Sequence, residues 1–158
     1  MWHREIAVYI LNEKNELLIQ KRAANKKLAA NKWALCAGHI EASETIIEAA
    51  MREVQEEVGI KNLSPADFIL FDIRKTEVLT DTVKNNHYKY CYILKTNLKE
   101  NEFVIQEEEL SEVKYVSFED LINLTDEERK DYTRSLSKEN IEMTVEKIEN
   151  KLKELKED

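Results

Sequence analysis

Apolar positions in the first third of the chain predict two strands joined as a hairpin. The segment 3–11 ends in six consecutive apolar residues, so both of its faces are apolar, as in a central strand covered on two sides. Residues 12–15 are polar and predict a turn, and the apolar run 17–19 begins the second strand. A short apolar run at 33–37 leads into Gly38 and His39, and its Trp33 is expected to lie in the core.

Three segments further along the chain carry strand patterns. Residues 68–73 form an apolar run that continues more weakly to 79, and residues 87–96 alternate with tyrosines on one face. We expect these two segments to pair antiparallel around the polar loop 80–86, which is long enough to overhang a site. The tyrosine row is then half-buried core. Residues 113–116 predict a last strand, which follows an acidic loop.

An amphipathic helix is predicted between residues 45 and 58. Its apolar side chains recur at the i, i+3, i+4, i+7 and i+11 spacing that leaves one face for the core. They are Ile47, Ala50, Met51, Val54 and Val58. Ser43 or Thr45 is suited to cap the start of this helix, and Gly59 suits its end.

The C-terminal part, about 118–157, is also predicted to be helical. Ser117 with Asp120 resembles a weak capping box, and Thr125 with Glu128 is a complete one. An apolar seam then recurs at alternating steps of four and three residues. It consists of Ile141, Val145, Ile148, Leu152 and Leu155. We expect the seam to pack on its own domain, while pairing with a second copy in a homodimer stays open.

Composition indicates one globular domain that spans residues 1–158. Hydrophobic residues make up 42% and charged residues 35% of the 158, which is typical of a folded domain. The formal charge of −8 argues against a sequence-independent binder of nucleic-acid polymers, because a polyanion requires a surface of lysine and arginine. No apolar run reaches membrane-spanning length, no signal-peptide pattern is present, and two cysteines are too few for a disulfide framework. We therefore expect a cytoplasmic protein, either monomer or homodimer, with no membrane partner.

The helix predicted at 45–58 carries a crowded acidic face. Glu53, Glu56 and Glu57 stand at i, i+3 and i+4, so their carboxylates share one side. Like charges at this spacing destabilise an isolated helix by roughly 0.2–0.5 kcal/mol per pair. The cluster is either a solvated acidic face or the ligand set of a divalent cation, for which carboxylate oxygens select Mg²⁺ or Mn²⁺. Such an ion can bridge phosphate oxygens and activate a bound water, which suggests attack of water on the phosphorus of a diphosphate.

Other residues have the types that a diphosphate site needs. Arg52 could pair with Glu44 across the preceding loop and hold Glu53 in position. Gly38 would let the backbone approach a metal or phosphate closely. The loop that begins near residue 20 supplies three cations that either bind a diphosphate or are ordinary loop cations; they are Arg22, Lys26 and Lys27.

The acidic loop before the last predicted strand offers further carboxylates. Glu108, Glu109 and Glu112 are each a candidate for an extra metal ligand or a catalytic base. The alternative is that this loop is simply solvated.

The segment 38–60 carries the strongest motif. It reads Gly38, five residues, Glu44, seven residues, Arg52-Glu53-Val54, one residue, Glu56-Glu57, one residue and Gly59-Ile60. This segment resembles the Nudix box at every fixed position and at the expected spacing. The resemblance implies an α/β fold, an α/β/α sandwich with a mixed sheet and, here, extra C-terminal helices. It also implies Mg²⁺-dependent hydrolysis of a nucleoside diphosphate linked to another group.

The resemblance carries roles over by position. Glu53, Glu56 and Glu57 would be metal ligands, with the Gly38 carbonyl a further one. Glu44 and Arg52 would support them. The likeness extends over residues 3–124 and includes LLIQKR, the pair at 26–27, the Gly-His pair at 38–39 and QEEELSEVKYVS. These segments resemble a subgroup related in sequence to isopentenyl-diphosphate isomerases. With Arg22, Lys26 and Lys27, we count His39 among the candidates for substrate binding.

Such an isomerase is the main alternative function. Its chemistry needs a cysteine directly before the Gly-His pair, a histidine-rich metal site and a later Glu-x-Glu pair. Here Ala37 precedes Gly38, and Cys36 lies one place earlier. His3 and His39 could fill two metal positions, but residues 85–87 lack the glutamates. The hydrolase is therefore favoured.

A nucleotide-sensing module without catalysis is the second alternative. It would predict erosion of the box, and none is seen. Two departures from the family pattern affect the loops that shape substrate entry. Ser43 stands where a glycine is common, and Ala30-Asn31 stands where Pro-Gly is typical.

Overall fold

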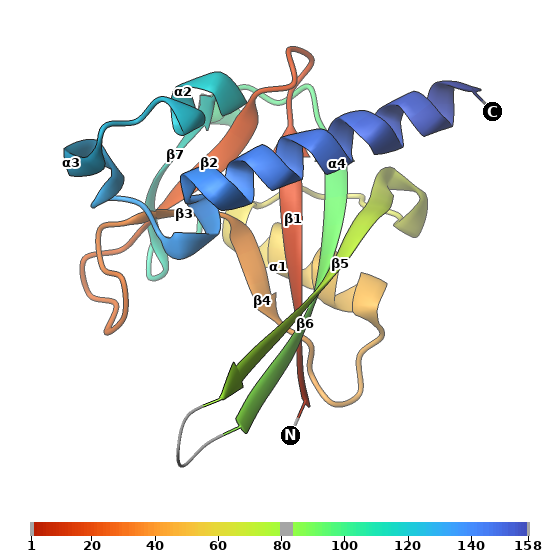
Figure 1. The fold of residues 1–158 in the computed structure, drawn as a ribbon, viewed down its shortest axis with the longest axis horizontal. Helices are drawn as coiled ribbons and strands as arrows, with labels where there is room; N and C mark the ends of the chain where they lie inside the picture. Colours follow the sequence, from red (N-terminus) through yellow and green to blue (C-terminus); the bar gives the residue numbers. More distant parts are fainter. Residues whose placement is uncertain (1, 80–83, 158) are drawn as a thin grey trace.

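The centre of the protein is a mixed sheet of seven strands with helices against both faces (Figure 1). The computed structural model describes residues 2–79 and 84–157. The strands are β1 (Trp2–Leu11), β2 (Leu17–Arg22), β3 (Trp33–Ala34), β4 (Cys36–His39), β5 (Phe68–Leu79), β6 (Lys84–Lys95) and β7 (Leu110–Val116). The α-helices are α1 (Ile46–Val58), α2 (Phe118–Ile122), α3 (Asp126–Arg129) and α4 (Lys138–Glu157). Short 3-10 turns are η1 (Pro65–Asp67), η2 (Glu100–Glu102) and η3 (Arg134–Leu136).

β1 is the central strand, as its two apolar faces predicted. It pairs in parallel with β6 along its whole length and antiparallel with β4 along its middle part. The predicted hairpin joins β1 to β2, but the two strands pair only at Leu11 and Leu17. β2 therefore diverges from β1 and pairs instead with β3 and β7, while β4 takes the place beside β1.

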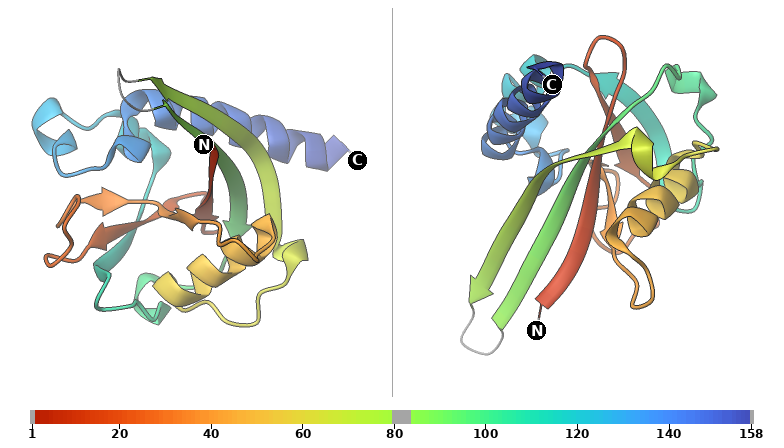
Figure 2. Two further views of the ribbon diagram at one scale, coloured as in Figure 1. Left: turned by 90° about the horizontal axis from the view of Figure 1, so that it is seen from below. Right: turned by 90° about the vertical axis from the view of Figure 1, so that its right-hand side faces the viewer.

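Residue alternation along β1 supplies two separate cores. The even-numbered residues among 6–11 pack against the apolar side of α1, and the odd-numbered ones pack against α2 and α4. Figure 2 shows the sheet between α1 on one side and α4 on the other. The predicted α/β/α sandwich with a mixed sheet is confirmed.

α1 begins and ends at residues that cap it. The Thr45 hydroxyl accepts a hydrogen bond from the Glu48 backbone N–H at 3.3 Å, so Thr45 rather than Ser43 is the N-cap. Gly59 ends the helix in the left-handed region, with φ of 71°. A Cβ on Gly59 would lie 2.6 Å from the carbonyl oxygen of Val104, so both conformation and space require glycine here.

α4 is tied to the sheet by a buried polar bridge. The Thr144 hydroxyl accepts a hydrogen bond from Arg74 Nη2 at 2.7 Å and lies 3.5 Å from the Tyr9 hydroxyl. Arg74 Nε also donates to Asp72 at 2.8 Å. Burial opposes ionisation of Asp72, but hydrogen bonds from Arg74 and Lys147 hold its pKa below the ordinary value. The charges of this bridge are therefore kept inside a largely apolar interface.

The C-terminal seam packs on the chain's own sheet. Ile141 and Ile148 are buried in the core beneath α4, and Val145 and Leu152 pack partly buried against it. Leu155, near the end of the helix, is 44% exposed. None of the helices in the described ranges is both long enough and apolar enough to cross a lipid bilayer.

Three strand boundaries correct the sequence prediction. β6 begins at Lys84, so residues 84–86 of the predicted loop are strand, and residues 80–83 lie outside the described part of the chain. β7 begins at Leu110 rather than at residue 113. In both cases backbone pairing extends past the apolar residues, because polar residues form ladder hydrogen bonds equally well. The run 33–37 divides into β3 and β4, because its first part pairs with β2 and its second part pairs with β1.

Replacing Gly59 by alanine is expected to lower the free energy of unfolding by about 2 kcal/mol or more, because the left-handed φ and the close Val104 backbone both disfavour a Cβ. Urea unfolding followed by circular dichroism measures this loss.

Asn62→Ala is the matched control, because Asn62 also has a positive φ, 60°, but lies on the surface. It is expected to lose only about 1 kcal/mol, the cost of the left-handed conformation alone. Equal losses in the two variants would contradict the role assigned to Val104.

Candidate active site

The acidic side of α1 lies against the end of β4. The Glu53 side chain is only 13% exposed, whereas Glu56 is 54% exposed. Glu57, one turn after Glu53, is half-buried. The three carboxylates predicted to share a patch are therefore in unequal surroundings, and two of them face the sheet.

Arg52 is the ion-pair partner of this acidic face. Its guanidinium donates two hydrogen bonds to Glu44, at 2.7 and 2.8 Å, and one to Glu53 Oε1 at 2.9 Å. It also donates to the carbonyl oxygen of His39 at 3.1 Å. The hydrogen bonds from Arg52 and from the Glu41 backbone lower the pKa of Glu44 to about 2, so Glu44 stays ionised. The pair expected between Arg52 and Glu44 is present, and it joins the loop before α1 to the helix.

Gly38 lies directly against the Glu53 carboxylate. A Cβ on Gly38 would be 2.2 Å from Glu53 Oε1, so a larger residue would push this side chain away. Glu53 is thus held between the backbone of β4 and the Arg52 guanidinium.

Glu57 is held from the sheet. Gln20 Nε2, on β2, donates a hydrogen bond to Glu57 Oε2 at 2.8 Å. Burial raises the pKa of Glu57 to about 7, against the opposing hydrogen bonds from Gln20 and the Cys36 thiol, and the nearby Glu53 raises it further. Burial also raises the pKa of Glu53, although Arg52 opposes this. The two carboxyl groups therefore retain a proton between them near neutral pH.

The chemistry of these oxygens fits a hard divalent cation. Across the described residues, no three His, Cys, Asp or Glu side chains converge as ligands of one ion. Glu56 turns toward Arg52 instead, at 3.5 Å. Glu53 and Glu57 nevertheless meet at one point, where a cation would replace their proton and offset their repulsion. Mg²⁺ and Mn²⁺ suit such carboxylate oxygens.

The predicted phosphate-binding cations gather around a cavity of about 450 Å³. The loop on its acidic side is bonded to the end of α1, where the Gln106 backbone N–H donates to the Glu57 carbonyl oxygen at 3.1 Å. The cavity is lined by Arg22, Asn25, Lys26, Lys27, Leu28, Glu108 and Glu109. The structure therefore brings two separate predicted groups together beside the C-terminal half of α1.

Charge pairing within this cavity is uneven. Lys26 forms an ion pair with Glu109, and Arg22 Nε donates to the carbonyl oxygen of Leu28 at 3.1 Å. Within residues 2–79 and 84–157, the side chains of Lys27 and Glu108 form no ion pair or hydrogen bond. Of the two glutamates that line the cavity, Glu108 is thus the unpaired one.

Glu112 and the His39 ring lie apart from this group. Glu112 is inside β7, opposite Lys21, so residue alternation places it on the sheet face away from Gln20. The His39 side chain is 74% exposed, and its Nδ1 lies 3.8 Å from Glu5 rather than near the box carboxylates.

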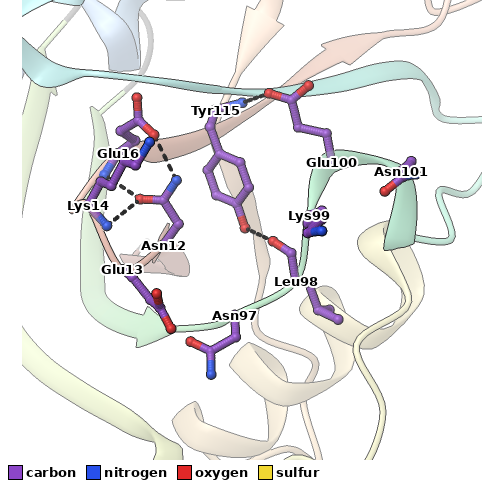
Figure 3. Close-up of a pocket in the computed structure, with 10 residues that line it drawn as sticks. All are labelled: Asn12, Glu13, Lys14, Glu16, Asn97, Leu98, Lys99, Glu100, Asn101 and Tyr115. Atoms are coloured by element: carbon purple, nitrogen blue, oxygen red, sulfur yellow. Dashed lines mark hydrogen bonds between the residues drawn. The ribbon is translucent and has the colours of Figure 1, made fainter.

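A larger cavity, about 650 Å³, lies elsewhere (Figure 3). It is formed by the turn between β1 and β2 and by the loop around η2, and the Tyr115 hydroxyl there donates to the carbonyl oxygen of Leu98 at 2.8 Å. No residue of the 38–60 segment lines it. Its size therefore does not make it the candidate active site.

Gln20 is a site residue that sequence reasoning missed. It is 5% exposed and directly follows the apolar run 17–19. A polar residue in a buried strand must find a hydrogen-bond partner, and this was the available signal.

Comparison with known proteins adds independent information. A family model described as the NUDIX domain matches residues 1–136. Nudix hydrolase 3 of Arabidopsis thaliana is 33% identical over 133 residues, which cover 80% of this chain and 17% of the relative. A Nudix hydrolase of Listeria monocytogenes is 32% identical over 120 residues, with coverage of 75% and 66%. An isopentenyl-diphosphate Delta-isomerase of Aliivibrio fischeri is 30% identical over 107 residues, with coverage of 67% and 59%.

These matches span less than two thirds of the length of each of the three relatives. Among solved structures, the NUDIX domain of Shewanella oneidensis NrtR, in complex with ADP ribose, superposes with a TM-score of 0.64 and 13% identity. That comparison covers 96% of this chain and 89% of the other, and it shows the same fold. Sequence motif, family model and fold agree, and the chain belongs to the Nudix family.

Proposed function

We propose that this chain is a Mg²⁺-dependent hydrolase, with Mn²⁺ as a possible substitute, that cleaves the diphosphate linkage of a nucleoside diphosphate derivative. One observation carries the proposal. Glu53 and Glu57 contact each other in a half-buried site beside the Gly38 backbone, with one guanidinium between Glu53 and Glu44. Such crowding is unfavourable unless a cation compensates it.

We assign metal binding and the positioning of the metal ligands to different residues of the site. Bound Mg²⁺ would neutralise the diphosphate and lower the pKa of an attacking water. Glu53, Glu56, Glu57 and the Gly38 carbonyl are the proposed ligands, with Glu44 and Arg52 as their positioning residues. Arg52 fixes Glu53, and Gln20 fixes Glu57, so that neither carboxylate has to be ordered during the reaction.

The cavity beside α1 is the proposed binding site for the phosphates. Arg22 keeps its two terminal nitrogens available, because its bond to Leu28 uses Nε. Lys27 adds an unpaired charge, and Lys26 is shared with Glu109. Among the described residues Glu108 has no such partner, whereas Glu109 is paired with Lys26, so we prefer Glu108 over Glu109 as the catalytic base.

The isomerase alternative is less well supported. Ala37, not a cysteine, precedes Gly38. Cys36 is 2% exposed, and burial and the Glu57 carboxylate raise the pKa of its thiol. A thiol in this position is poorly suited to acid–base chemistry on a substrate.

Glu57→Gln is expected to lower kcat by roughly 100-fold or more, because the site loses an anionic ligand while the hydrogen bond to Gln20 can persist. The measurement is release of nucleoside monophosphate from a panel of nucleoside diphosphate derivatives, with Mg²⁺ or Mn²⁺.

Glu48→Gln is the control on the same helix, because Glu48 is exposed in the first turn of α1 and outside the cluster. It should retain wild-type turnover. Isomerisation of isopentenyl diphosphate without cleavage would overturn the hydrolase, and nucleotide binding without turnover by the wild type would favour the sensor.

The metal-free protein is expected to lose stability between pH 5 and pH 8. The pKa of Glu57 is about 7 in the fold and 4.5 ordinarily, so the folded state binds the extra proton in this range. Its contribution is complete below pH 4.5 and is lost as pH rises through 7. A loss on the order of 2 kcal/mol should appear in urea unfolding.

Mg²⁺ at millimolar concentration should restore stability at pH 8, where the carboxylates are ionised. Glu57→Gln should remove this pH dependence, and Glu48→Gln should keep it. The same loss in wild type and Glu57→Gln would show that another group is responsible.

A further inference from the structure

A cavity of about 330 Å³ lies on the α4 side of the sheet, opposite α1. Its walls come from β1, β5 and β6, from η3 and from the first turn of α4. It is lined by Glu5, Tyr9, Arg74, His87, Lys89, Arg134, Ser135 and Asn140. The catalytic glutamates are not part of it.

The charge of this cavity differs from that of the protein. Three permanent cations and a histidine surround it with one carboxylate, although the whole chain has a formal charge of −8. Arg74 is already balanced by Asp72. Lys89 and Arg134, in contrast, form no ion pair or side-chain hydrogen bond within the described ranges. A concave site with unpaired cations attracts an anion.

The wall that carries Arg134 is fixed before any ligand binds. Asn140 Nδ2 donates to the Arg134 carbonyl oxygen at 2.9 Å and so joins η3 to the first turn of α4. Ser135 and Thr133 hydroxyls lie within 2.8 Å of each other. On the opposite wall, Lys89 lies within the long β6 strand. The backbone that carries both residues is therefore fixed, so that binding would have to order only their two side chains.

The cavity and the box glutamates flank the same short strand. Glu5, in the cavity wall, pairs with His39 in β4, and the neighbouring Gly38 touches Glu53 on the other face. The His39 ring lies 3.8 Å from Glu5 of the cavity wall, and the next residue along β4, Gly38, lies against Glu53. Among the described strands, β4 pairs with β1 alone, so its other edge is unpaired. A substrate that reached from the box glutamates to the cavity would have to pass this edge.

We propose that this cavity binds an anionic group, a phosphate or a carboxylate, carried by the substrate away from its scissile diphosphate, with Lys89 and Arg134 as the charged contacts. The inference rests on the proposed function, and it narrows the substrate to a diphosphate derivative with a second anionic group. A hydrocarbon such as an isopentenyl chain is excluded from this cavity, because it would desolvate the charged walls without replacing their hydrogen bonds.

Matched substrate pairs test the proposal. NADPH and NADH differ by one phosphate, and UDP-glucuronate and UDP-glucose differ by one carboxylate. For at least one pair, kcat/KM of the wild type is expected to be roughly tenfold higher for the more anionic member, the factor given by one charge-assisted hydrogen bond. The pair that shows the preference identifies the anion.

Lys89→Met and Arg134→Gln should each reduce this preference, expressed as the ratio of the two kcat/KM values. Lys14→Met removes the same charge at the distant cavity of Figure 3 and should leave the ratio unchanged. Equal kcat/KM values in both pairs, or a preference that survives both substitutions, would overturn the proposal.

A binding measurement separates this inference from the proposed function. Inorganic phosphate, added without metal, should raise the Tm of the wild type and of Glu57→Gln. The rise should shrink in the Lys89→Met/Arg134→Gln double variant and persist in Lys14→Met. An undiminished rise in the double variant would overturn the cavity assignment. Failure of the wild type to cleave any substrate would overturn the hydrolase, while the phosphate result would still decide the cavity.

Discussion

The neighbouring residues are arranged around one contact, that between the carboxyl groups of Glu53 and Glu57. One guanidinium, Arg52, serves Glu44 and Glu53 together, so the site retains excess negative charge. Gly38 leaves space for one carboxylate, and Gln20 orders the other. Each of these partners comes from a different element, and each would be unnecessary for an acidic helix face in water. The arrangement is that of a cation site, in which the carboxylates repel one another until a bound cation offsets their charge.

Divergence of β1 and β2 gives this site its place in the fold. The hairpin pairs at one position only, and β4 enters the opened space beside β1. β4 then separates the box glutamates from the positively charged cavity on the α4 side. A short strand with one free edge therefore organises both the proposed chemistry and the proposed specificity.

Local spacing predicted much of this from the sequence. The box motif predicted the Glu44–Arg52 pair, and the helix pattern predicted the Gly59 cap, because both depend on residues close together in the chain. Gln20 and the Arg74–Thr144 bridge could not be predicted in this way. Their partners are distant in sequence and are set by strand register and helix docking. Glu112 shows the same limit, since a strand that starts three residues earlier than expected determines which face the side chain occupies.

Parallel pairing of β1 with β6 has a consequence for how the chain folds. Ile6 pairs with Tyr90, and the chain between these two residues contains α1 and four strands. Such non-local pairing makes folding slow, because the chain loses the entropy of closing a long loop before the strand contacts stabilise it. During synthesis the apolar run 6–11 leaves the ribosome well before its central partner exists. This run is the segment that we expect molecular chaperones to shield on the nascent chain.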